Sequence, residues 1–223
     1  MEAFIKGMKL VVLNVAYPFA PVSPDALGNA EQLLTRLDAA LACSGHESFV
    51  MACEGSVTEG ILLATPKPLD TRDELERHRI HEQYRFTLQS FLEKWPIDLI
   101  HMHGADFYEY LPSPGVPVLV TLHLPVEQYP ESIFHLDRPQ TFLQCVSARQ
   151  RDACPPCPYL LSKLGSDFAA EPLDTVHAAR FLDAGAIDSY FTIYERLVGE
   201  ARALEEVAQS YHETSVIREA VHA

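Results

Sequence analysis

The sequence predicts an α/β fold, with a single Rossmann-like, doubly wound and mainly parallel sheet and C-terminal helices packed back on it. Residues 10–16 form a nearly continuous apolar, β-branched run, which is typical of a parallel strand covered on both faces. Similar runs recur up to residue 150, separated by helical stretches that would form right-handed crossovers. The 223 residues also fit one hydrophobic core, because single cores grow to about 250 residues.

The predicted elements follow one another as strand, loop, helix and strand. The first strand leads into a proline-rich loop at 17–27, and Gly28 opens an amphipathic helix that ends at Gly45. A second, more polar helix is predicted at 70–94. The remaining strands are predicted at 46–53, 59–64, 98–104, 116–123 and 141–147.

The pattern changes after the last of these strands, where Ser147 is placed to cap a helix. The proline-rich stretch that follows cannot lie inside a helix. Helical spacing of apolar residues returns between Ile187 and Leu204, which is typical of a helix docked on a core. We therefore expect a Rossmann-like domain at 1–150, an irregular bridge at 151–178 and docking C-terminal helices at 179–223.

Composition excludes several classes of protein. There are 17 Lys and Arg against 31 Asp and Glu, a formal net charge of -14, so a nucleic-acid partner is not expected. The apolar run at 8–16 contains Lys9 and Asn14 and is too short and too polar for a signal or membrane segment. Five cysteines without regular spacing indicate a reducing compartment, and we expect a cytoplasmic protein.

Three polar clusters come at predicted strand ends: the 17–30 loop, the 101–106 segment and the 121–123 terminus. Ligands of doubly wound sheets bind beyond the carboxyl ends of the strands. Gly28 before a helix could place backbone N–H groups against a phosphate, although a simple glycine turn explains it equally well. No GxGxxG or P-loop spacing accompanies it.

His103 and His123 end two of these strands, where an imidazole can act as a general base or hydrogen-bond a hydroxyl; a structural role is the alternative for each. A zinc site from His101, His103, Asp106 and His123 is a weaker alternative, because no HExxH or paired CxxC accompanies them. Cys154 and Cys157 have CxxC spacing, but they lie late and among prolines, which favours an irregular loop with two incidental thiols.

Taken in sequence order, the predicted strands, loops and helices resemble the N-terminal half of glycosyltransferase family four, the retaining enzymes of GT-B fold. The resemblance covers about residues 8–150 and rests on Tyr17-Pro-Phe, Gly28-Asn-Ala-Glu-Gln, Ser44-Gly-His-Glu, Asp98-Leu-Ile-His-Met-His-Gly, Val118-Leu-Val-Thr-Leu-His and Cys145-Val-Ser. In that family this domain receives the acceptor, and a Gly-Gly loop beside the first helix approaches the donor diphosphate. Here Asn29 replaces the second glycine.

We therefore expect particular roles for the residues at these strand ends and in the first loop. His103 and His123 would be catalytic, Gly28 and Asn29 would contact the donor phosphate, and substrate contacts would come from Tyr17, Glu31 and Asp106. No metal or cofactor is implied other than a nucleotide sugar as co-substrate.

Family members continue into a second domain that binds the nucleotide sugar, and residues 148–186 do not resemble it. Residues 187–197 resemble the family's returning C-terminal helix. We therefore expect a glycosyltransferase-like protein reduced to its acceptor-side half, which needs a donor-domain partner chain or a homodimer for transfer to a sugar or sugar-phosphate acceptor. The alternatives are a non-catalytic sugar or sugar-phosphate binding module and, less favoured, a vestigial product without activity.

Overall fold

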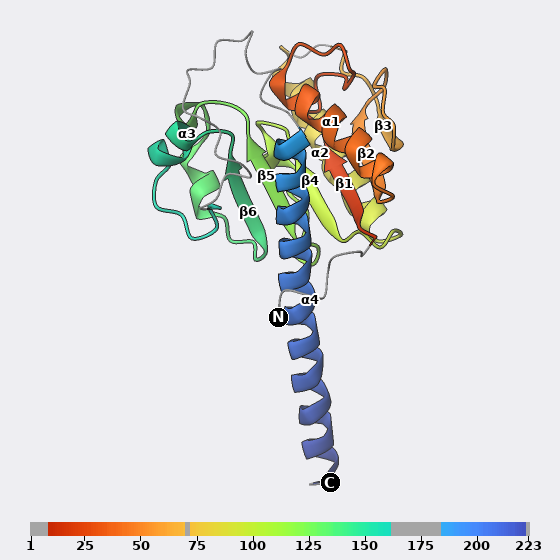
Figure 1. Ribbon diagram of the computed structural model, residues 1–223, viewed down its shortest axis with the longest axis vertical. Helices are drawn as coiled ribbons and strands as arrows, with labels where there is room; N and C mark the ends of the chain where they lie inside the picture. Colours follow the sequence, from red (N-terminus) through yellow and green to blue (C-terminus); the bar gives the residue numbers. More distant parts are fainter. Residues whose placement is uncertain (1–8, 70–71, 162–183, 222–223) are drawn as a thin grey trace.

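Six parallel strands form one sheet (Figure 1). The computed structural model describes residues 9–69, 72–161 and 184–221. The strand order is β3-β2-β1-β4-β5-β6, so the sheet winds outward from its centre in both directions. This confirms the predicted Rossmann-like α/β fold. The strands are β1 (Val11–Val15), β2 (Glu47–Cys53), β3 (Ile61–Thr65), β4 (Leu99–Met102), β5 (Val118–Leu122) and β6 (Thr141–Cys145).

Helices cover both faces of the sheet. They are α1 (Asn29–Cys43), α2 (Glu74–Leu92), α3 (Ala148–Ala153) and α4 (Ala184–Val221), with 3-10 turns η1 (Phe107–Glu109), η2 (Val126–Gln128) and η3 (Glu131–His135). Apolar residues of α1 and α4 share one core cluster with Val12 of β1, and those of α2 share another with Leu13. Neighbouring residues of a strand point to opposite faces, so both faces of β1 are buried.

Side chains at the helix starts explain where two of the helices begin. The carboxylate of Asp73 accepts a hydrogen bond from the Leu75 N–H at the start of α2. The Ser147 hydroxyl oxygen accepts one from the Gln150 N–H at the start of α3, as expected from the sequence. Asp and Ser are favoured at such positions because their oxygens satisfy N–H groups that have no partner within the helix.

The first half of α4 packs back on the sheet, as the sequence predicts. Its Tyr190, Tyr194 and Leu197 are buried in the same cluster as Val12. The Tyr194 hydroxyl lies 2.6 Å from a ring nitrogen of His101 in β4. One face of α4 therefore anchors this C-terminal segment to the central strands, although the two are far apart in the sequence.

The apolar stripe of α4 was predicted to stay on the sheet as far as Leu204, and this is wrong at its end. Leu204 is 59% exposed, because α4 leaves the sheet after Ala201 and extends away from the body (Figure 1). Arg202 reaches Asp98, just before β4, at 2.6 Å. The helix thus reaches the amino edge of the sheet at this point, where there are no further strand residues to cover its apolar face.

The predicted domain division stays a prediction, because residues 162–183, which include most of the proposed bridge, lie outside the described residues. The described start of that bridge runs beside β6: Leu143 accepts from the Leu161 N–H at 2.8 Å and donates to the Tyr159 carbonyl at 2.9 Å. No helix in the described ranges is long and apolar enough to cross a membrane.

Candidate functional site

A cavity of about 410 Å³ lies beyond the carboxyl ends of β5 and β6. Its walls come from Asn29 at the start of α1, from residues 123–127 after β5, and from five residues between 146 and 153 around α3. This is the edge at which doubly wound sheets bind ligands. The volume lies within the range of small-molecule sites, about 300–1,000 Å³.

Gln150 holds two walls of this cavity together. Its side-chain oxygen accepts a hydrogen bond from the Val146 N–H at 2.8 Å. Its side-chain nitrogen donates to the carbonyls of Leu122 at 2.9 Å and Leu124 at 2.6 Å. The loops after β5 and β6 are therefore fixed relative to each other, although sequence reasoning did not single out Gln150. The available signal was its position three residues after the capping Ser147.

The two predicted catalytic histidines lie together at this edge. His103 Nδ1 is 3.4 Å from His123 Nε2, and His123 lines the cavity. Burial lowers the pKa of His123 to about 4 and that of His103 well below its usual value. Both rings are thus neutral near pH 7, and within the pair one ring donates while the other accepts.

This neutrality limits the chemistry of the pair. A base with a pKa of about 4 removes a proton from a hydroxyl poorly at neutral pH, because general bases work best with a pKa near the working pH. A neutral imidazole still donates or accepts a hydrogen bond. The geometry therefore suits hydroxyl recognition by His123 better than proton abstraction.

His101 has a structural position. Its Nδ1 lies 2.6 Å from the Tyr194 hydroxyl and its Nε2 lies 2.8 Å from the Thr121 hydroxyl, so neither ring nitrogen is left for a metal. Within the part of the chain that the structure describes, no group of three or more His, Cys, Asp or Glu side chains is arranged to hold a metal ion. The zinc alternative therefore has no support in this geometry.

The predicted phosphate-binding turn is already close to an anion. Gly28 has an ordinary extended backbone, and a Cβ added there would collide with the carboxylate of Glu31. This carboxylate lies against the positive end of α1, where a phosphate would also be attracted. A phosphate would have to displace or oppose it, so phosphate binding at Gly28 stays a prediction. Asn29, by contrast, lines the cavity.

Asp106 belongs to a separate cluster under α2. Its Oδ2 lies 2.6 Å from His81 Nε2, and its Oδ1 accepts a hydrogen bond from the Tyr110 hydroxyl at 3.0 Å. Sequence reasoning missed His81. The signal was its helical spacing with Tyr84 and Leu88, which are buried on the same face of α2.

Tyr17 joins this second cluster through Phe19. The rings of Tyr17 and Phe19 have centroids 5.3 Å apart, and Phe19 meets the His81 ring edge-on at 5.4 Å. The Arg77 guanidinium stacks over Phe19 at 4.5 Å. The structure thus divides the predicted site residues: Asn29 and His123 line the cavity and His103 contacts His123, whereas Tyr17 and Asp106 lie in the α2 cluster.

Comparison with known protein families finds no family model that matches this chain, and no curated protein matches it.

Proposed function

We propose that this chain binds a sugar or sugar phosphate in the cavity at the carboxyl edge, as the acceptor-side half of a glycosyltransferase-like protein. The observation that carries the proposal is the cavity itself, placed at the ligand-binding edge of a doubly wound sheet with His123 and Asn29 in its walls. Transfer from a nucleotide sugar would require a donor-binding half from a partner chain or a second copy.

The polar groups of the walls suit a hydroxyl-rich ligand. Asn29 offers an amide that both donates and accepts, and His123 offers a neutral imidazole. Arg149 lies at the exposed side of the same cavity and supplies a cation that matches a phosphate group. Glu127, in the wall that follows β5, offers a carboxylate that can accept hydrogen bonds from sugar hydroxyls.

A binding module without transfer activity is the second candidate, and the low pKa of His123 favours it. The described residues form one sheet, so these residues do not supply a second, donor-binding Rossmann-like unit. The two candidates share the cavity and differ only in whether bound ligand is glycosylated. A transfer assay with radiolabelled nucleotide sugars, with and without candidate partner proteins, separates them.

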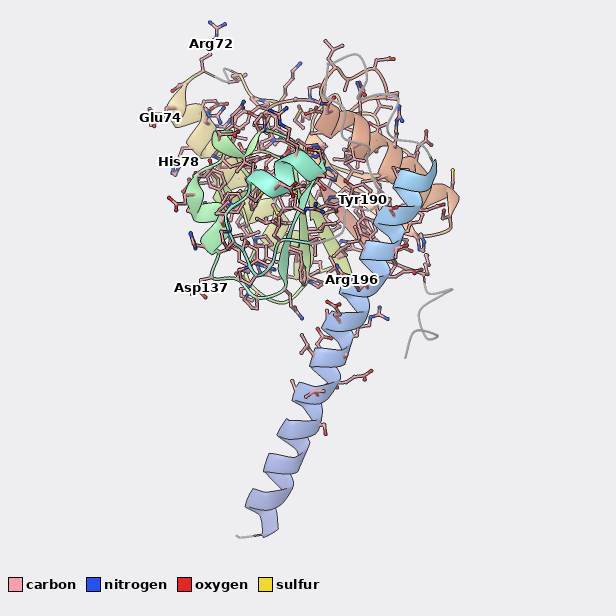
Figure 2. The ribbon with its side chains drawn as sticks, turned by 60° about the vertical axis from the view of Figure 1, so that its left-hand side comes forward. Arg72, Glu74, His78, Asp137, Tyr190 and Arg196 are labelled. Atoms are coloured by element: carbon pink, nitrogen blue, oxygen red, sulfur yellow. The ribbon has the colours of Figure 1, made fainter. Side chains whose placement is uncertain are left out.

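Binding itself is tested by thermal unfolding with three sets of probes: free monosaccharides, hexose phosphates and nucleotide sugars. A ligand at 100 times its Kd stabilises the folded state by about 2.7 kcal/mol, which raises Tm clearly. We expect hexose phosphates to raise Tm, and His123→Ala and Asn29→Ala to reduce that rise. The matched control is His78→Ala, because His78 is exposed on the outer side of α2 (Figure 2). An equal rise in all variants, or none with any sugar, would refute binding in this cavity.

A further inference from the structure

The thiols of Cys145 and Cys154 lie in contact at the C-terminal end of α3. Cys145 is the last residue of β6 and is only 2% exposed, whereas Cys154 follows the last residue of α3 and is partly exposed. Their sulfur atoms lie 3.6 Å apart, and both cysteines are free. The sequence drew attention to Cys154 and Cys157 through their spacing, but the thiol-to-thiol contact in the structure joins Cys154 to Cys145.

This pair encloses one wall of the cavity. The residues between the two cysteines, 146–153, include five that line it. Cys145 directly precedes the first of them, Val146, and Cys154 directly follows the last, Ala153. A bond between the sulfurs would close this wall, including all of α3, into a covalent loop.

We propose that Cys145 and Cys154 form a reversible disulfide that fixes this cavity wall, with a low-molecular-weight disulfide such as oxidised glutathione as the oxidant. This inference does not depend on the proposed sugar ligand. It assigns a redox modification to two cysteines that are not themselves among the residues lining the cavity.

The exchange takes place in two steps that balance. The Cys154 thiolate attacks one sulfur of the small disulfide, forms a mixed disulfide and releases one small thiolate. The Cys145 thiolate then attacks the Cys154 sulfur and releases the second. The two protein thiols are oxidised, the small disulfide is reduced, and the two protons lost by the cysteines end on the two released thiols.

Exposure and hydrogen bonding set this order. Cys154 is the more accessible sulfur, and its thiol donates to the Gln150 carbonyl at 3.4 Å. The Cys145 thiol then donates to Cys154, so the buried sulfur already faces the atom it would attack. Burial raises the pKa of both thiols, which makes the pair slow to oxidise at neutral pH and unsuited to rapid turnover.

The test is to incubate the full, folded chain with oxidised glutathione at mildly alkaline pH, block the remaining thiols and map the tryptic peptides by mass spectrometry. Trypsin cleaves after Arg149 and Arg151, so a disulfide from Cys145 to Cys154 joins two peptides. A disulfide from Cys154 to Cys157 stays within one peptide. The two pairings are therefore distinguished directly in the unmutated protein.

We expect the joined peptides, with reversal by a reducing agent, a Tm increase of roughly 5 °C and slower amide exchange in 146–153. Cys145→Ser and Cys154→Ser should each abolish these changes, whereas Cys157→Ser and Cys43→Ser should leave them intact. A bond within the 154–157 peptide, glutathione adducts that never resolve, or joined peptides without slower exchange would each overturn the proposal. Sugar binding is measured separately, so either proposal can fail alone.

Discussion

Removing the His81 imidazole should destabilise the fold strongly, because it would leave a buried carboxylate without its closest partner. The Asp106 and His81 side chains are each only 9% exposed, and His81 Nε2 lies 2.6 Å from Asp106 Oδ2. In His81→Ala that oxygen would keep only Arg77, at 3.9 Å. The Tyr110 hydroxyl would still donate to the other oxygen.

The expected loss follows from the burial of the pair. Removing one partner of a buried hydrogen bond leaves the other partner unsatisfied and costs about 1–3 kcal/mol. Loss of the imidazole packing on Phe19 acts in the same direction. The lost packing raises the expected cost, whereas the retained Tyr110 bond and the nearby Arg77 limit it, so about 3 kcal/mol is expected. Asp106→Asn keeps the shape but replaces one acceptor oxygen with an amide donor, so the bonds to His81 and Tyr110 cannot both be kept unchanged, and about 1.5–3 kcal/mol is expected.

Urea unfolding of the single and double variants measures these values, and a double-mutant cycle isolates the coupling between the two side chains. His78→Ala is the matched control on the same helix, since His78 is 68% exposed and should change stability by less than about 0.5 kcal/mol. If His81→Ala costs no more than His78→Ala, or if the coupling is zero, the pair is not a buried anchor between α2 and the loop after β4.

Three further predictions concern other buried polar groups. Tyr194→Phe removes the hydroxyl that lies 2.6 Å from His101, and it should lower the free energy of unfolding in urea by about 1–2 kcal/mol. Phe191→Leu, at a partly buried position of the same helix, serves as a control for changes in packing. Arg138→Lys should lower the free energy of unfolding by about 2–3 kcal/mol in the same assay. The buried guanidinium donates to four backbone carbonyls and to the Thr141 hydroxyl, whereas a lysine ammonium has only three donors. Stability should fall as pH drops from about 6.5 towards 4, because the unfolded His123 takes up a proton that the folded one, with a pKa of about 4, resists. His123→Gln should reduce this pH dependence, and an unchanged profile would contradict the burial of that ring.

The fold was predictable because its signals are local and strong. Strands buried on both faces need continuous apolar runs, and β1 has one; a docked helix needs an apolar stripe, and α4 has one around Tyr194. The error at Leu204 has a physical reason. An apolar stripe indicates which face of a helix is apolar. It does not indicate how far the sheet extends beneath the helix, because that depends on the lengths of the strands.

The candidate site was predictable only in part. His123 was found because the carboxyl end of a parallel strand is a general place for ligand contacts. His81 was not found, because its role depends on Asp106, which lies 25 positions away and is brought close by the packing of α2. The same holds for the thiol contact. The CxxC spacing of Cys154 and Cys157 was interpreted as two incidental thiols in a loop, whereas the fold places the sulfur of Cys145, nine positions before Cys154, 3.6 Å from the Cys154 sulfur.

The docking of α4 and the geometry of the cavity are connected by a continuous series of contacts. Tyr194 bonds to His101, the His101 and His103 rings lie 4.0 Å apart between centroids, and His103 Nδ1 lies 3.4 Å from His123 Nε2. In the described part of the chain, the other ring nitrogen of His103 has no hydrogen-bond partner, so nothing else orients that ring by hydrogen bonding. Figure 2 shows the preceding turn of α4, at Tyr190, against the body of the protein. A helix that leaves the sheet beyond Ala201 thus contributes through its first half to the orientation of a cavity side chain, and this arrangement depends on hydrogen bonds between neutral imidazoles and buried hydroxyls.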